Sequence, residues 1–149
     1  MNPMQIKDNL KTILDGYPNT YTFTKSLAEK TILKRRGTLP TCIVRPSMVG
    51  STHKEPFVGW TDTLSSIGAP LTFGGIGIYK YQIGNGENNI DPCAVDQCIN
   101  HILIATCHCA YNPNELHIYN HTSTYINPLS QKIYNHSANE FYKYYPYDK

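Results

Sequence analysis

The sequence predicts an α/β fold that forms the C-terminal part of an open sheet of parallel strands. Two observations support this fold class. Helix and strand patterns follow one another in the order helix, helix, strand, long irregular segment, helix, strand and polar tail. The first strand pattern comes directly after a helix, as in half of a βαβ unit. A chain of 149 residues buries on the order of 68–70% of its unfolded surface, which is enough for one core.

The composition argues against two classes of partner. The chain carries 13 Lys and Arg against 11 Asp and Glu, a net charge of +2, so we expect no broad basic surface for nucleic acid. No apolar run approaches the ~20 residues that cross a bilayer, and the polar N-terminus is unlike a secretory signal. We therefore expect a soluble chain that is not processed at its N-terminus.

Two helices are predicted in the first 36 residues. The apolar residues of the first recur at i, i+4, i+7 and i+8: Ile6, Leu10, Ile13 and Leu14. This amphipathic helix ends within residues 15–18, where Gly and Pro stop it. The second helix, residues 19–36, opens at Asn19, a good N-cap residue. Its last turn is basic and offsets the helix dipole.

A strand and a long irregular segment follow. Residues 41–44 are β-branched and bounded by prolines, which predicts a short buried strand. Residues 46–91 are rich in Gly, Pro, Ser, Thr and Asn. We expect them to form a loop with a few short elements that covers an active site, because long structureless segments are usually functional. Gly75 and Gly77 do not complete a dinucleotide fingerprint, since Lys80 occupies the place of its third Gly.

The remaining residues predict a helix, a strand and a tail. Apolar residues from Val95 to Thr106 follow a helical period, with Pro92 near the first turn and Asp91 or Asp96 available as a cap. Residues 116–120 alternate as a strand, and the polar, Tyr-rich tail 128–149 can form a helix.

The cysteines and histidines do not predict a metal site. None of the five cysteines forms a Cys-x-x-Cys pair, and the six histidines are scattered singly. The cluster Cys107, His108 and Cys109 lies on a predicted helix, where neighbouring side chains point about 100° apart and do not converge on one ion. We expect reduced thiols and no metal.

One pair of residues has a clear chemical rationale. Tyr21 and Lys25 stand four residues apart, so both side chains project from the same face of the second helix. A phenol with a pKa of about 10 is a poor acid at neutral pH, but a nearby ammonium lowers that pKa. Tyr21 could then protonate a carbonyl oxygen during hydride transfer, while Lys25 holds cofactor ribose hydroxyls. A half-buried Tyr beside a snorkelling Lys is the alternative.

The residues around this pair carry a family resemblance. Residues 18–30, PNTYTFTKSLAEK, closely resemble the catalytic helix of alcohol-forming fatty acyl-CoA reductases, whose motif reads PNTYTFTK-x-LAE. Residues 43–50, IVRPSMVG, resemble the family's IVRPS-x-V-G, and residues 55–60, EPFVGW, resemble its EP-x-PGW. Weaker similarities follow in register in the Gly-rich segment 75–86, in the Asp spacing of 91–96 and in 118–128.

The resemblance implies a fold and an activity. The fold is the extended short-chain dehydrogenase/reductase type with a male-sterility-type NAD(P)-binding domain, a Rossmann-like doubly wound parallel sheet of which this chain is an incomplete part. The family reduces a long-chain acyl-CoA to a primary alcohol and coenzyme A in two hydride transfers from NADPH. The first transfer releases coenzyme A and leaves an aldehyde, which the second reduces.

Family motifs also suggest roles for individual residues. Tyr21 would be the proton donor and Lys25 its ribose-binding partner, with Pro46, Ser47 and Val49 beside the nicotinamide. Residues 55–60 would cover the substrate, or Trp60 would anchor the loop by burying its ring. By resemblance the full protein works at the cytosolic face of the endoplasmic reticulum or peroxisome, with any membrane association through parts outside this chain.

Departures from the family pattern leave alternatives open. The chain contains no Gly-rich phosphate turn and no upstream Ser/Thr segment; Cys93 and Ala94 replace the family's IP, and His121 replaces a Cys. As a partial domain it would be inactive alone and expose unpaired strand edges, so we expect poor solubility or dependence on a partner. One alternative is a truncated, non-catalytic relative that folds on another chain or binds acyl groups. Another is a different extended dehydrogenase/reductase, such as a sugar-nucleotide epimerase or a thioester reductase.

Overall fold

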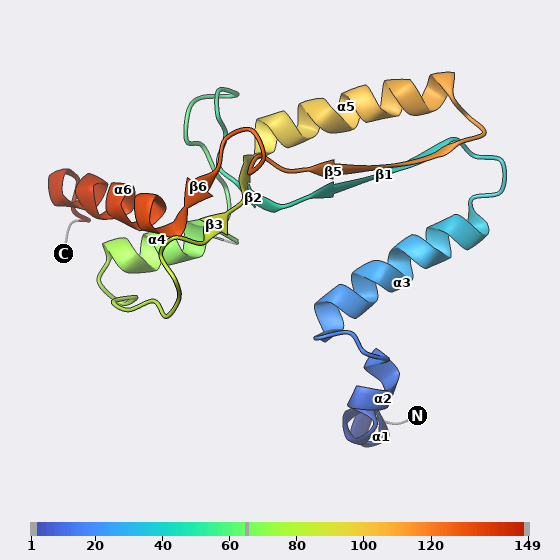
Figure 1. Cartoon of the computed structure of the whole chain (residues 1–149), viewed down its shortest axis with the longest axis horizontal. Helices are drawn as coiled ribbons and strands as arrows, with labels where there is room; N and C mark the ends of the chain where they lie inside the picture. Colours follow the sequence, from blue (N-terminus) through green and yellow to red (C-terminus); the bar gives the residue numbers. More distant parts are fainter. Residues whose placement is uncertain (1–2, 65, 148–149) are drawn as a thin grey trace.

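The computed structural model describes residues 3–64 and 66–147. In Figure 1 the helix α5 (Val95–Tyr111) lies along the paired strands β1 (Thr41–Pro46) and β5 (Leu116–His121), while the N-terminal helices α1 to α3, within residues 3–35, project away from them. A second group of elements, with α4 and α6 side by side, lies at the other end of the molecule. This mixed α/β arrangement, with two small parallel sheets, is consistent with part of a Rossmann-like domain and confirms the predicted fold class.

The first predicted helix is divided into α1 (Pro3–Asp8) and α2 (Leu10–Leu14). The break falls at Asn9, whose side-chain amide donates to the Gln5 carbonyl at 2.8 Å and competes with the main-chain N–H for that acceptor. The predicted end is confirmed, since Asp15 and Gly16 both have positive φ. Helix α3 (Thr20–Arg35) agrees with its predicted bounds, and the Asn19 side chain caps it.

Strand β1 (Thr41–Pro46) pairs in parallel with β5 (Leu116–His121), with Ile43 opposite Ile118. Helix α5 (Val95–Tyr111) covers this pair through Ala105 and Cys109, which are buried. The prediction of a buried strand is only partly correct. Residues 41–44 are half-buried, because within the described chain β1 has a strand partner on one edge only.

The segment predicted as a long loop contains three short elements: β2 (Met48–Gly50), α4 (Gly68–Gly75) and β3 (Asn89–Ile90). Strand β2 pairs in parallel with β4 (Pro92–Ala94), and β3 pairs antiparallel with β6 (Leu129–Ser130). The tail is helical, as the pattern allowed, and forms α6 (Gln131–Tyr144).

Of the expectations at the start of α5, the position of Pro92 is correct and the cap is wrong. Pro92 lies near the first helical turn, in β4 just before the N-cap residue, and its carbonyl accepts the Ser123 hydroxyl at 3.0 Å. Neither Asp91 nor Asp96 caps the helix; the N-cap residue is Ala94, whose side chain makes no capping bond. Both carboxylates instead bind backbone amides of loops, as described below.

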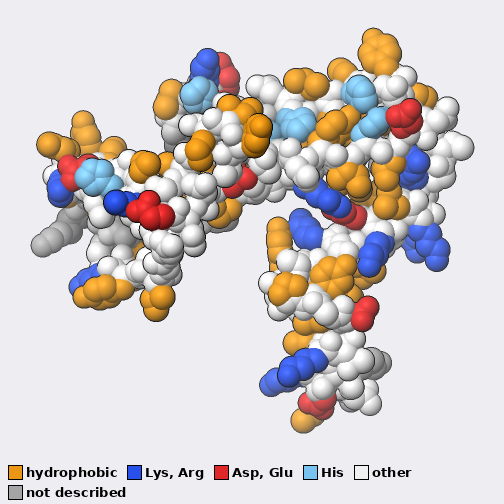
Figure 2. All heavy atoms as spheres, in the orientation of Figure 1, with side chains coloured by type: hydrophobic (Ala, Val, Ile, Leu, Met, Phe, Trp, Pro, Cys, Tyr) orange, Lys and Arg blue, Asp and Glu red, His pale blue; other side chains and the backbone are white. Residues whose placement is uncertain are grey.

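Few residues are fully buried in the described chain. The buried apolar residues are Cys93, Cys98, Ala105 and Cys109, whereas many large apolar side chains remain exposed. Orange apolar groups accordingly appear over much of the visible face in Figure 2. Over residues 3–64 and 66–147, no helix is long and apolar enough to cross a membrane.

Candidate active site

The five residues singled out in the sequence line one cleft. This cleft has a volume of about 830 Å³ and brings together α3, the end of β1, the 59–63 loop and α4. Figure 2 shows the molecule hollowed between α3 and the part that carries α4 and α6. Its lining includes all the predicted site residues: Tyr21, Lys25, Pro46, Ser47 and Val49. Segments 20 or more residues apart in sequence therefore meet at this cleft.

Tyr21 and Lys25 form a pair on α3. The Lys25 ammonium lies 5.6 Å from the centre of the Tyr21 ring, so the expected one-turn juxtaposition is present. Tyr21 is 68% exposed and lies in the first turn of the helix. Within the described chain, neither the Tyr21 hydroxyl nor the Lys25 ammonium has a hydrogen-bond or ion-pair partner. Both polar ends are therefore free to contact a ligand in the cleft.

Pro46 and Ser47 lie at the carboxyl end of β1, and Val49 lies in β2. Ligands of open α/β sheets bind beyond the carboxyl ends of the strands, so this placement suits a binding site. The Ser47 hydroxyl donates to the Asp91 carbonyl, and the Ser47 amide donates to the His121 carbonyl at 3.1 Å. Ser47 thus also ties β1 to its neighbours, which leaves its hydroxyl oxygen able to accept one further bond.

An ion pair that the sequence reasoning missed connects α3 to β1. Arg45 grips the Glu29 carboxylate with two parallel bonds, from Nε to Oε1 at 2.9 Å and from Nη2 to Oε2 at 2.6 Å. The guanidinium lowers the pKa of Glu29. Both residues line the cleft. Since Glu29 lies one turn beyond Lys25, this bidentate pair holds the helix that carries Tyr21 beside the strand end.

The loop over the cleft is held by two further residues that the sequence reasoning did not assign to it. Thr52 is 5% exposed; its hydroxyl donates to the Phe57 carbonyl at 2.6 Å and accepts from the Trp60 amide at 2.9 Å. Asp96, in the first turn of α5, accepts the backbone amides of residues 53–55 at 2.8, 2.8 and 3.2 Å. These amides hold the pKa of Asp96 well below its usual range.

Trp60 does not anchor this loop by burial. It is 37% exposed and lines the cleft, so the expectation of a buried ring is wrong. The backbone bonds of Thr52 already fix the turn, because the Thr52 and Trp60 main chains also pair at 3.0 Å. The indole is therefore left at the surface of the cleft.

Asp91 fixes the other side of the strand end. One carboxylate oxygen accepts the Ser123 amide at 2.8 Å, the Ser123 hydroxyl at 3.0 Å and the Thr124 amide at 3.2 Å. These bonds lower the pKa of Asp91 against the opposing effect of its burial. Asp91 and Asp96 are the two aspartates of the resembled family motif, and both act here on backbone amides.

A second tyrosine–lysine pair lies outside the cleft. The Tyr17 hydroxyl is 2.6 Å from the Ser26 hydroxyl and 3.5 Å from the Lys30 ammonium, and both contacts lower the pKa of Tyr17. Tyr17 and Lys30 do not line the cleft that holds Tyr21. This pair joins the α2–α3 connection to the middle of α3.

The described residues contain no cluster of three or more His, Cys, Asp or Glu side chains that could hold a metal ion. Cys107 is exposed and Cys109 is buried, so the two thiols point in different directions from α5, as the helical spacing predicts. Burial raises the pKa of Cys42 and Cys98, which keeps these two thiols protonated.

Comparison with known proteins places the chain in a family. The family model described as male sterility protein, an NAD-binding family, matches residues 1–102, and the chain belongs to that family. The chain is 34% identical over 131 residues to fatty acyl-CoA reductase wat of Drosophila melanogaster, covering 87% of this chain and 25% of that protein. It is 33% identical over 130 residues to fatty acyl-CoA reductase 1 of Gallus gallus, again covering 87% and 25%.

A plant relative gives the same result. Putative fatty acyl-CoA reductase 7 of Arabidopsis thaliana is 34% identical over 132 residues, which cover 87% of this chain and 32% of that protein. The chain thus spans about a quarter to a third of the length of these curated relatives. The predicted family is confirmed.

The residues of the cleft fit one end of a nicotinamide dinucleotide, the cofactor class that the family indicates. A free ammonium and a free phenol face a cleft at a strand's carboxyl end, which is a donor set suited to ribose hydroxyls. The pyrophosphate has no matching Gly-rich turn in the chain, because the Gly75 and Gly77 spacing fails and both residues flank the end of α4.

Proposed function

We propose that this chain is the part of an NADPH-dependent, alcohol-forming fatty acyl-CoA reductase that carries the catalytic tyrosine. The substrate would be a long-chain acyl-CoA and the products a primary fatty alcohol and coenzyme A. The family, the three relatives and the Tyr21–Lys25 pair support this proposal. The preference for NADPH over NADH rests on the family resemblance alone.

When bound beside Pro46 and Val49, a reduced nicotinamide would supply the hydride for the carbonyl carbon. Tyr21 donates its phenolic proton to the carbonyl oxygen, and Lys25 stabilises the phenolate that remains. In the first round this gives a hemithioacetal, whose C–S bond breaks as the C=O bond re-forms; the hydroxyl proton is lost, the coenzyme A leaves as its thiol, and the aldehyde accepts the second hydride and proton. Lys25 also holds the ribose hydroxyls through its free ammonium. Pro46 and Val49 present apolar surface to the nicotinamide, and Ser47 offers its hydroxyl oxygen at the strand end.

The supporting residues keep this arrangement in place. The ion pair of Glu29 and Arg45 links α3 to β1 near the cleft. Asp96 and Thr52 hold the loop of residues 51–60, which we propose covers the substrate. Covering the cleft would exclude water from the reacting carbonyl.

One observation carries the proposal: Tyr21 and Lys25, one helical turn apart, face the same cleft as the carboxyl end of β1. A tyrosine and a lysine that are four residues apart by chance on a surface helix would not be expected to line the same cleft as the carboxyl end of a strand. We further propose that the full protein works at a cytosolic membrane face, as the resemblance implies, with any membrane contact made by other parts.

The test is acyl-CoA-dependent NADPH oxidation by the protein expressed from its full-length transcript, with the alcohol product detected. Tyr21→Phe should lower turnover by about 10²–10⁴-fold, the usual contribution of a general acid. Tyr17→Phe is the matched control, because it removes a hydroxyl from the same region without touching the cleft, and it should leave turnover nearly unchanged. Full activity in Tyr21→Phe would overturn the proposal.

A further inference from the structure

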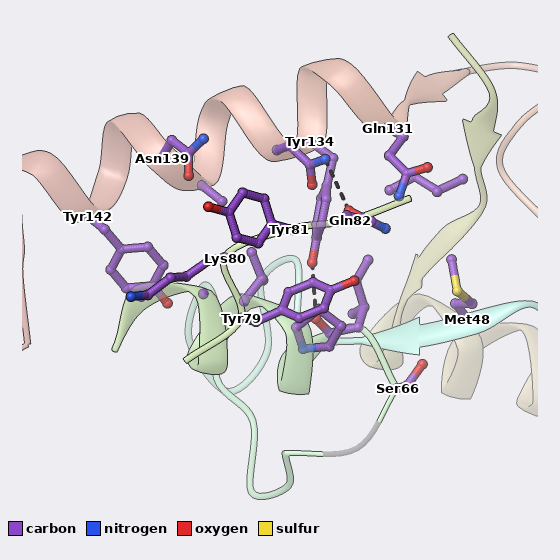
Figure 3. A pocket seen from close by; sticks show the side chains of 18 residues that line it. Met48, Ser66, Tyr79, Lys80, Tyr81, Gln82, Gln131, Tyr134, Asn139 and Tyr142 are labelled. Atoms are coloured by element: carbon purple, nitrogen blue, oxygen red, sulfur yellow. Dashed lines mark hydrogen bonds between the residues drawn. The ribbon is translucent and has the colours of Figure 1, made fainter. Parts of the chain in front are cut away.

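A second cavity lies between α4 and α6. It has a volume of about 350 Å³, within the range of small-ligand pockets. Figure 3 shows α6 along one side, α4 along the other, and the segment of residues 79–82 between them. We call it the α4–α6 cavity. Its walls are built mainly from two short helices and one connecting segment, none of which contributes Tyr21 or Lys25.

The α4–α6 cavity adjoins the cleft that holds Tyr21 and Lys25. Four residues line both: Ser66, Ile67, Leu71 and Tyr142. The two hollows therefore lie next to each other at α4 and at Tyr142. A long ligand with its reacting end at Tyr21 would have the α4–α6 cavity as the neighbouring space for its other end.

One part of the cavity wall is apolar. Tyr134 donates its hydroxyl to the Ile67 carbonyl at 3.0 Å, and burial raises the pKa of Tyr134 to about 12. Its polar end is thus satisfied and uncharged, and the ring is left to form part of the wall (Figure 3). Aliphatic groups of Pro70, Leu71 and Ala138 complete this part of the lining.

Polar residues line both ends of the cavity, with Lys80 and Asn139 at one end and Gln82 and Gln131 at the other (Figure 3). The Asn135 amide donates to the Gln82 side-chain carbonyl at 3.1 Å, so these two groups satisfy each other. Among the described residues that line the cavity, Lys80 is the one charged residue, and none of them carries a carboxylate. A hydrocarbon chain in this cavity would desolvate only one charged group, the Lys80 ammonium. A polyanion such as a pyrophosphate would find only that one ammonium to bind.

We propose that the α4–α6 cavity holds the hydrocarbon chain of the acyl substrate and sets the chain length that the enzyme prefers. This assignment rests on the proposed function, since it gives the place of the acyl tail of that same substrate. Ala138 is the decisive position, because it lines the cavity from α6 and its small side chain leaves the space that the tail occupies.

The test is to fill the cavity and compare two substrates in the full-length protein. Ala138→Phe should lower kcat/KM for hexadecanoyl-CoA by at least about tenfold, the effect of one or more methylenes excluded from a hydrophobic pocket. The kcat/KM for octanoyl-CoA should change less than twofold by the same reasoning. Ser137→Phe places the same ring on the neighbouring residue, which does not line the cavity, and should alter neither value.

A second variant and a binding measurement keep the test decisive. Asn139→Phe adds the ring at an exposed position on the cavity wall, where folding should be preserved, and should shift preference in the same direction. The affinity for hexadecanoyl-CoA, measured by calorimetry, should fall in both variants. This measurement does not depend on turnover. Equal affinity and equal chain-length preference in wild type and variants would overturn the cavity assignment. A wild-type protein that binds hexadecanoyl-CoA in this way but reduces no acyl-CoA would instead overturn the proposed function.

Discussion

The N-cap of α3 controls the position of the proposed proton donor. Asn19 Oδ1 accepts the Thr22 amide at 2.9 Å and the Thr22 hydroxyl at 3.2 Å. Tyr21 lies in this first turn and is 68% exposed, so little packing holds the turn in place. We therefore expect Asn19→Ala to release the first turn and, with it, the phenol that faces the cleft.

The magnitude follows from the loss of one cap. Replacing an N-cap Asn by Ala costs about 1 kcal/mol, which is about fivefold in the equilibrium between the formed and frayed turn. Amide hydrogen exchange of Thr22 and Phe23 in the full-length protein should therefore be about fivefold faster in Asn19→Ala. Turnover should fall by no more than the same factor, because the remaining helix still carries Lys25.

Asn19→Asp is the matched control for this experiment. The Asp carboxylate keeps an acceptor for the Thr22 amide and adds negative charge at a helix N-terminus, which is favourable. Exchange should then be as slow as in wild type or slower. Unchanged exchange in Asn19→Ala, or equally fast exchange in Asn19→Asp, would refute the argument that the cap orders Tyr21.

Two further predictions concern the loop and the helix pair. In the folded chain the pKa of Asp96 is below its ordinary value of 3.8. The ionised carboxylate therefore contributes its full stabilisation of the fold above pH 3.8, and this contribution is lost as the pH falls through the folded-state pKa. The urea midpoint of wild type should therefore fall on acidification more steeply than that of Asp96→Asn; parallel curves would contradict this. Gly75→Ala should cost about 1–3 kcal/mol of unfolding free energy by overpacking, because the new Cβ would lie 2.5 Å from the Tyr142 ring. Gly74→Ala, whose Cβ meets only a carbonyl at 3.9 Å, should show no such loss in the same urea titration.

Local sequence signals were sufficient for α3, for α5 and for the two strands β1 and β5, although not for their pairing or for α4. Asn19 opens a helix because its side chain accepts an amide wherever the chain turns into helical conformation, and Gly16 stops one because it readily takes positive φ. The strand around Ile43 was visible from its β-branched residues. The prediction of one continuous first helix was wrong, because the Asn9 side chain competes for a main-chain carbonyl and apolar periodicity does not report this effect.

The contacts that assemble the site were beyond the reach of those signals. Asp91 and Asp96 are suitable helix caps by sequence, yet each binds amides that lie 32 to 43 residues away. Thr52 carries no distinctive pattern around it, although its burial and its bonds to residue 60 fix the turn. The packing of whole elements decides which of these distant groups form hydrogen bonds with each other. Local propensity does not specify which distant backbone amide will need an acceptor from outside its own element.

The sequence by itself determined the family, the α/β class and the pairing of Tyr21 with Lys25, because motifs and helical spacing are local properties of the chain. Only the tertiary structure decided that this pair faces the strand end that carries Pro46 and Ser47, and that the α4–α6 cavity adjoins the cleft. A cleft exists only between elements, and its walls come from residues whose proximity depends on the packing of α3, β1, α4 and α6.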